Sequence, residues 1–167
     1  MCREYETEMI PYGKHEITQD DLDAVLGVLK GEWLTTGPYV ESFENMLSEY
    51  LGVPTISVSS GTAALHCAYS AIGIKPGDEV ITPPLTFVAT QSTAVALGAR
   101  IRFADILPST GNIDPACVEP LINCKTKAIV AVDYAGHPAN MEELQSIAKR
   151  NNLYLIEDAA HSLGSTL

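Results

Sequence analysis

The sequence predicts an α/β fold, in which a mostly parallel sheet lies between two layers of helices. Short apolar runs alternate along the chain with helical patterns of about 10–15 residues, as in crossover units. Of the 167 residues, 46% are hydrophobic and 19% are charged, a composition typical of folded proteins. Turn residues separate the runs, and no low-complexity segment interrupts them.

Two helices are predicted in the first part of the chain. One covers 20–31, where a helical stripe ends at Gly31, and the other covers 40–52 and ends at Gly52. The apolar stripe of the first helix consists of Leu22, Val25, Leu26 and Leu29. We expect residues 1–38 to form a helical arm and a link, and residues 39–167 to form part of a larger domain.

Strands and helices are then predicted to alternate. The expected strands are 55–59, 78–83, 100–106, 127–132 and 153–161, and the expected helices are 61–73, 86–98, 114–123 and 140–152. Ligands of such sheets bind beyond the carboxyl ends of the strands. A functional site is therefore expected among the residues that follow each strand.

Charge and composition exclude some classes of partner. The net charge of −11 argues against nucleic acid or an anionic membrane surface, because phosphates would be repelled. No apolar run approaches the roughly 20 residues that span a bilayer. The four cysteines form no CxxC pair, which favours reduced thiols in a cytoplasmic protein.

The first strand end to be considered is "SVSSGTAAL", which opens a helix at Gly61 and Thr62. Free amides and the positive dipole end of such a helix suit a phosphate dianion. An ordinary cap is the alternative, because serine and threonine are preferred there. The motif is neither a Walker loop nor a GxGxxG fingerprint, which disfavours nucleoside triphosphates and dinucleotides.

Two further strand ends leave alternatives open. In "ITPPLTFVAT", Phe87 is expected early in a helix, where it either stacks on a flat ligand ring or belongs to the core. In "VDYAGHPANM", Asp133, Tyr134 and His137 surround a glycine, and Asn140 is a plausible helix cap. A histidine in such a loop is usually solvated, so the role of His137 stays open.

The last strand end, "LYLIEDAAH", places two acids after an apolar run. We expect the Asp158 carboxylate to lie deep at the end of a buried strand, where it needs a cation or several hydrogen-bond donors. Three interpretations remain: a metal site with Glu157 and His161, a partner for a protonated heterocycle, or a turn cap. Since side chains alternate along a strand, Glu157 and Asp158 should point to different faces.

The sequence resembles the DegT/StrS-type nucleotide-sugar aminotransferases, which are pyridoxal-phosphate (PLP) enzymes of the aspartate aminotransferase fold. The similar segments are "WLTTGP", "VSSGTAAL", "ITPPLTFVAT", "TGNIDP", "VDYAGHPANM" and "IEDAAHSLGS", in the family's order and spacing. With "IPYGKHEIT", they are most similar to the branch that aminates UDP-4-keto-6-deoxy-N-acetylhexosamines in pseudaminic acid biosynthesis. This resemblance implies a homodimer that uses L-glutamate and a UDP-keto-sugar.

The resemblance also implies a role for individual residues. Asp158 would pair with the pyridinium nitrogen of PLP, Phe87 would stack on the ring, and His161 would lie beside the phenolic oxygen or brace Asp158. The cofactor phosphate would bind Gly61, Thr62 and Ala63, and the substrate entrance would contain Thr35, Thr36 and Gly37. Residues 39–167 would then be part of the PLP-binding large domain.

The family's Schiff-base lysine follows the Asp-Ala-Ala-His stretch by a couple of dozen residues. No lysine of this chain lies in that context, so we expect an amino-terminal fragment that is inactive alone. The lysines are Lys14, Lys30, Lys75, Lys125, Lys127 and Lys149. Two alternatives are a non-catalytic remnant, which binds phosphate or PLP weakly or pairs with an intact relative, and an unrelated α/β phospho-ligand binder.

Overall fold

The computed structural model describes residues 14–166, in two compact units that comprise Met1–Ser57 and Val58–Leu167. Part of the predicted arm, residues 1–13, lies outside the described residues. The boundary between the two units follows Ser57, later in the chain than the boundary between 38 and 39 that the sequence suggested. The functional division into an arm and a cofactor-binding part stays a prediction.

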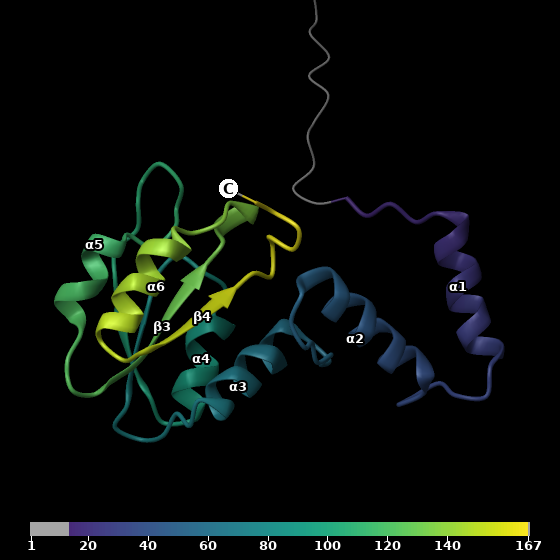
Figure 1. The fold of residues 1–167 in the computed structure, drawn as a ribbon, viewed down its shortest axis with the longest axis horizontal. Coiled ribbons are helices and arrows are strands. Elements are labelled where there is room, and N and C mark those ends of the chain that lie inside the picture. Colours follow the sequence, from purple (N-terminus) through teal and green to yellow (C-terminus); the bar gives the residue numbers. More distant parts are fainter. Residues whose placement is uncertain (1–13, 167) are drawn as a thin grey trace, which may run out of the picture. The chain divides into compact units, whose positions relative to one another are not determined.

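The first unit contains two helices, α1 (Gln19–Lys30) and α2 (Pro38–Leu51), and both predicted helices are confirmed (Figure 1). A capping box begins α1: the Thr18 amide donates to the Asp21 carboxylate (2.7 Å), and the Asp21 amide donates to the Thr18 hydroxyl (3.3 Å). Gly52 ends α2 in the left-handed region, with φ of 70°.

The strand predicted over 55–59 is wrong, because this stretch is not in strand conformation. Its backbone amides bind side chains of α2 in place of a neighbouring strand. The Thr55 amide donates to the Ser48 hydroxyl (2.9 Å), and the Ser57 amide donates to the Glu44 carboxylate (2.7 Å). These bonds attach the stretch to α2, which explains why the first unit extends to Ser57.

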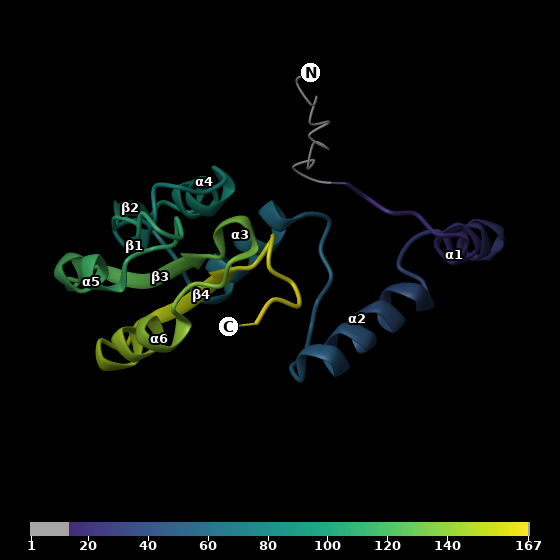
Figure 2. The same ribbon diagram turned by 90° about the horizontal axis from the view of Figure 1, so that it is seen from above.

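The second unit contains the predicted parallel sheet. Within residues 58–166 the strands are β1 (Glu79–Thr82), β2 (Arg100–Phe103), β3 (Thr126–Val132) and β4 (Tyr154–Asp158), in the order β2-β1-β3-β4. Every pair is parallel, and Val132 of β3 lies opposite Asp158 of β4. The α/β fold class is confirmed, and Figure 2 shows helices on both sides of the sheet.

The helices of this unit lie between the strands in sequence. They are α3 (Gly61–Ala71), α4 (Ala89–Ala96), α5 (Pro115–Val118) with a 3₁₀ turn at Glu119–Leu121, a 3₁₀ turn at Tyr134–Gly136, and α6 (Met141–Arg150). The predicted Asn140 cap is confirmed, since its side chain accepts from the Glu143 amide at 3.2 Å. Phe87 precedes α4, so its expected place inside the helix is wrong.

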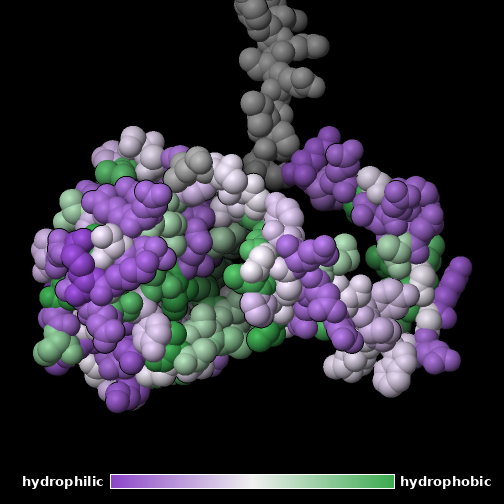
Figure 3. Space-filling model, viewed as in Figure 1, coloured by the Kyte–Doolittle hydropathy of each residue, from purple (hydrophilic) through white to green (hydrophobic). Residues whose placement is uncertain are grey.

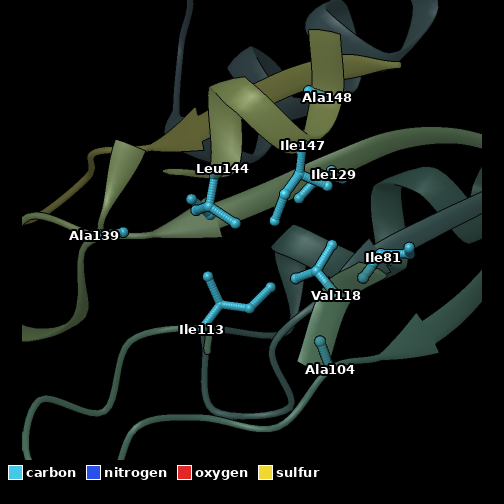
Figure 4. Close-up of a cluster of buried hydrophobic side chains, with 10 residues drawn as sticks. Ile81, Ala104, Ile113, Val118, Ile129, Ala139, Leu144, Ile147 and Ala148 are labelled. Carbon is cyan, nitrogen blue, oxygen red and sulfur yellow. The ribbon is translucent and has the colours of Figure 1, made fainter. Parts of the chain in front are cut away.

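Alternating strand residues form two cores, one on each face of the sheet. Ile81, Ile129 and Ala131 pack with α5 and α6 (Figure 4), whereas Val80, Ala128 and Val130 pack with α3 and α4. The members contributed by α6 are Leu144, Ile147 and Ala148, and those contributed by α3 are Leu65 and Tyr69. The sheet is therefore the middle of three layers.

The last strand is less buried than the sequence suggested. Among the described residues β4 pairs only with β3, which places it at an edge of the sheet. Tyr154 is 49% exposed, and Asp158 is half-buried. Within residues 14–166 the apolar run before Asp158 thus belongs to the last strand of the sheet, and the Asp158 carboxylate is less buried there than expected.

The surface is mixed in character. Figure 3 shows hydrophilic side chains over α5 and α6 and hydrophobic ones at other places on the same face. No helix within residues 14–166 is long and apolar enough to cross a membrane.

We expect Leu144→Ala to lower the free energy of unfolding by about 2–5 kcal/mol, because it opens a cavity beneath α6. Leu144 is fully buried in the core between α6 and the sheet. Gln145→Ala, on the exposed side of the same helix, should change it by at most about 0.5 kcal/mol. Urea unfolding followed by circular dichroism measures both, and equal losses would contradict this packing.

Candidate functional site at the carboxyl edge of the sheet

The first turn of α3 offers free backbone amides. The Ser60 hydroxyl accepts from the Ala63 amide (3.2 Å), so the cap that the sequence suggested is present. The amides of Gly61 and Thr62 have no acceptor within residues 14–166. Because α3 leads into the start of β1, its amino end lies toward the carboxyl edge of the sheet. A capped helix start and two free amides therefore coexist here.

Asp158 faces the layer formed by α3 and α4. Asp158 is two residues after Ile156 in β4, so both side chains lie on the same face of the sheet, and Ile156 packs in the core beneath these helices. Its Oδ2 accepts a hydrogen bond from the Thr90 hydroxyl of α4 at 2.8 Å, and its Oδ1 is 3.4 Å from the Ala160 amide. A single short side-chain bond therefore holds this carboxylate.

Thr90 is part of a chain of hydroxyl groups. The Thr86 and Thr90 hydroxyls lie 2.8 Å apart, and the Tyr69 hydroxyl of α3 donates to the Thr90 carbonyl at 2.6 Å. Burial, and secondly the negative charge of Asp158, raises the pKa of Tyr69. These contacts join α3, α4 and β4 at one place.

Sequence reasoning missed all three hydroxyl residues. Thr86 and Thr90 are four residues apart in "TFVAT", a spacing that places side chains next to each other in helical geometry. That spacing was the available signal, but it does not name Asp158 as the acceptor. The acceptor follows from the packing of α4 near the end of β4.

Glu157 faces the opposite layer, as the alternation of side chains predicted. Glu157 is two residues after Leu155 and lies on the same face of the sheet, and Leu155 packs against the core beneath α6. Although the residue is exposed overall, desolvation of its carboxyl group, and secondly the nearby Asp133 carboxylate, raises the pKa of Glu157. Within residues 14–166 no three histidine, cysteine or acidic side chains lie close enough to hold a metal ion.

Asp133 organises the loop that follows β3. It is 3% exposed, and its carboxylate accepts from the Ala139 amide (2.9 Å) and from the Ser162 hydroxyl (2.5 Å). Asn112 holds the same loop by donating to the carbonyls of His137 (2.9 Å) and Pro138 (3.0 Å). The segments after β3 and β4 are thereby tied together, while the His137 side chain is exposed.

The other predicted residues are placed as follows. Phe87 is 73% exposed at the carboxyl end of β1, three residues before Thr90, so the core alternative for this ring is wrong. His161 is exposed after β4, and its side chain has no hydrogen bond within the described residues. Thr35, Thr36 and Gly37 belong to the first unit, where Thr36 adopts a positive φ of 48°.

Lysines of the second unit lie away from this edge. Lys75 and Lys125 precede β1 and β3, Lys127 is near the start of β3, and Lys149 is in the last turn of α6, which leads into β4. All of them are toward the amino edge of the sheet. No lysine of residues 58–166 therefore accompanies Asp158.

Comparison with known proteins agrees with this arrangement. A sequence model of the DegT/DnrJ/EryC1/StrS aminotransferase family matches residues 15–167. Over 161 residues the chain is 45% identical to the UDP-4-amino-4,6-dideoxy-N-acetyl-beta-L-altrosamine transaminase of Campylobacter jejuni, which covers 94% of this chain and 42% of the relative.

Two solved structures are similar. PseC of Helicobacter pylori, an aminotransferase involved in pseudaminic acid biosynthesis, has a TM-score of 0.87 and 38% identity over 92% of this chain and 42% of its own. NtdA of Bacillus subtilis with bound cofactor PMP has a TM-score of 0.83 and 40% identity over 89% and 35%. This chain thus spans about two fifths of the length of the relatives that it matches.

We expect the wild type to lose stability relative to Glu157→Gln as the pH rises from 4 to 7. The free energy of unfolding of the variant minus that of the wild type should therefore increase over this range. Because the pKa of Glu157 is higher in the folded state than in the unfolded state, its protonation stabilises the fold. This stabilisation is complete at a pH below the unfolded-state pKa of about 4.3. This contribution is lost as the pH rises through the higher folded value. Urea midpoints at both pH values measure the difference.

Glu142→Gln is the control, because Glu142 is an exposed glutamate of α6 without a side-chain hydrogen bond among the described residues. It should show no such rise. A Glu157→Gln difference that stays flat or falls with pH would mean that neither desolvation nor Asp133 raises the pKa of this carboxyl group.

Proposed function

Because this chain belongs to the DegT/DnrJ/EryC1/StrS aminotransferase family, we propose that residues 58–166 bind PLP within a nucleotide-sugar aminotransferase. The observation that carries this proposal is Asp158, an acid at the carboxyl edge that is held from behind by the Thr90 hydroxyl. Such a carboxylate suits a protonated ring nitrogen. A turn cap would not need this bond from a helix on another segment.

The residues present fit both ends of the cofactor. The first turn of α3 provides the amides of Gly61 and Thr62 and the hydroxyl of Thr62 for a phosphate, while the Ala63 amide is already bound to Ser60. We therefore assign the phosphate to Gly61 and Thr62, whereas the family resemblance suggested Ala63 as well. The Asp158 carboxylate suits the pyridinium at the other end, because an opposite charge favours the protonated ring.

In our proposal, Phe87 and His161 contact the pyridine ring of PLP. The exposed Phe87 side chain stacks on its face, which accounts for an aromatic ring that the core leaves uncovered. His161 lies three residues beyond Asp158 and is assigned to the phenolic oxygen, since no bond to Asp158 supports a bracing role. When bound, the cofactor supplies the ring that accepts an electron pair from the amino-bearing carbon.

We further propose that L-glutamate is the amino donor and that a UDP-4-keto-6-deoxy-hexosamine is the acceptor. The names and similarity of the Campylobacter and Helicobacter relatives support this substrate class. Thr35, Thr36 and Gly37 are assigned to the substrate entrance. A cytoplasmic homodimer is the proposed form of the enzyme.

We expect Asp158→Asn to weaken the binding of pyridoxamine 5′-phosphate to this chain by about tenfold or more, because an amide offers the ring no negative charge. Glu157→Gln should bind like the wild type, since Glu157 faces the layer of α6. Titrations followed by the fluorescence of the ligand measure both. The reverse order of effects would refute the assignment of Asp158.

The same pair of variants tests the reaction. In a hybrid that joins this chain to the remaining part of the Campylobacter transaminase, glutamate-dependent amination of the UDP-4-keto-sugar should appear. Asp158→Asn should reduce it on the order of a hundredfold or more, the loss typical of one electrostatic group in an active site. Mass spectrometry of the sugar nucleotide measures the rate. A hybrid that binds the cofactor and aminates other sugars only would refute the proposed acceptor.

We expect no stoichiometric adduct at one lysine when this chain is mixed with PLP and reduced with borohydride. The lysines of residues 58–166 lie toward the opposite edge of the sheet from Asp158. Peptide mapping by mass spectrometry should find only weak, scattered labelling. Stoichiometric labelling at Lys127 or Lys149 would place the aldehyde far from Asp158 and contradict the proposed orientation.

A further inference from the structure

We propose that Thr90 is a positioning residue for Asp158, and that Thr86 supports it by donating to the Thr90 hydroxyl. This inference rests on the proposed function, because it concerns how the chain holds the carboxylate toward a pyridinium ring. Neither the family match nor the sequence motifs identify these two hydroxyl groups as partners of Asp158.

The direction of the bonds follows from their chemistry. An ionised carboxylate only accepts hydrogen bonds, so the single hydroxyl proton of Thr90 is directed to Asp158 Oδ2 at 2.8 Å. The Thr86 and Thr90 hydroxyls lie 2.8 Å apart, and because the Thr90 proton is already used, Thr86 must be the donor in this bond. A chain that runs from Thr86 through Thr90 to Asp158 results.

Thr90 itself is firmly held. It is fully buried, its amide donates to the Phe87 carbonyl (3.1 Å), and its carbonyl accepts from the buried Tyr69 hydroxyl (2.6 Å). Asp158, by contrast, is half-buried at the end of β4. A buried donor, held by two backbone hydrogen bonds, thus binds a carboxylate that is only half-buried.

The second carboxylate oxygen shows what this arrangement achieves. Oδ1 lies 3.4 Å from the Ala160 amide, a long contact that leaves most of its accepting capacity unused. With Oδ2 held by Thr90, Oδ1 is the oxygen left for a ligand. Removal of the Thr90 hydroxyl should therefore loosen the carboxylate and weaken its interaction with a ring nitrogen specifically.

The test compares two ligands that differ at one ring atom. Pyridoxamine 5′-phosphate has the ring nitrogen, and its 1-deaza analogue has a C–H group there, so the ratio of their dissociation constants reports on Asp158. Thr90→Val should reduce the wild-type preference for the nitrogen ring by about tenfold, the lower part of the range for groups that orient a ligand-binding side chain. Thr90→Ser should restore the preference, because it keeps the hydroxyl.

Thr93→Val is the matched control. Thr93 is also buried in α4, but its hydroxyl donates to the Ala89 carbonyl at 2.7 Å and does not reach Asp158. A variant that only disturbs the packing of α4 should weaken both ligands equally and leave the ratio unchanged. Thr86→Val should lower the ratio less than Thr90→Val does, because Thr90 keeps its proton for Asp158.

The outcomes separate this inference from the proposed function. If the wild type shows no preference, or Asp158→Asn leaves the preference intact, the pyridinium assignment is wrong and the role of Thr90 is lost with it. If Asp158→Asn abolishes the preference while Thr90→Val retains it, only the positioning role is overturned. Should Thr90→Val not fold, Thr90→Ala, which also lacks the hydroxyl, takes its place, and an unchanged ratio in Thr90→Ala overturns that role.

Discussion

Opposite orientation of adjacent side chains along β4 is the constraint on which the carboxyl edge depends. It sends Glu157 toward the layer of α6, where desolvation and Asp133 act on it, and Asp158 toward the layer of α3 and α4, where Thr90 binds it. A slip of one residue in the pairing of β4 with β3 would exchange the two environments. The register that sets Val132 opposite Asp158 therefore determines which acid faces the ring in our proposal.

The neighbouring loops reinforce this register. Asp133 receives the Ser162 hydroxyl from beyond β4, and the Asp133 amide donates to the Asp158 carbonyl at 3.2 Å. Gly136 allows the chain to pass close to the His161 carbonyl, since a Cβ atom there would lie 2.9 Å from that oxygen. The segment that carries His161 is thus fixed by contacts with the loop after β3. Its side chain remains at the surface.

Much of this arrangement could be predicted from the sequence. Periodicity located both helices of the first unit and the strands from β1 to β4, and strand alternation separated Glu157 from Asp158. What failed depends on which strands are neighbours. The apolar run before Asp158 suggested a buried strand, whereas among the described residues β4 pairs on one side only. The run over 55–59 resembles a strand, although α2 side chains bind its amides. Thr90 was missed for the same reason, because its acceptor lies 68 residues away in the chain.

The separation of lysines from the carboxyl edge has an electrostatic consequence. The cations of residues 58–166 lie in or before the strands, or in the last turn of α6, and Arg102 is directed to Glu79, the first residue of β1, at 3.9 Å. Asp133, Glu157 and Asp158 lie at the other edge. A phosphate that approaches the first turn of α3 is therefore met by backbone amides and the positive end of the helix dipole, with no lysine of residues 58–166 beside it.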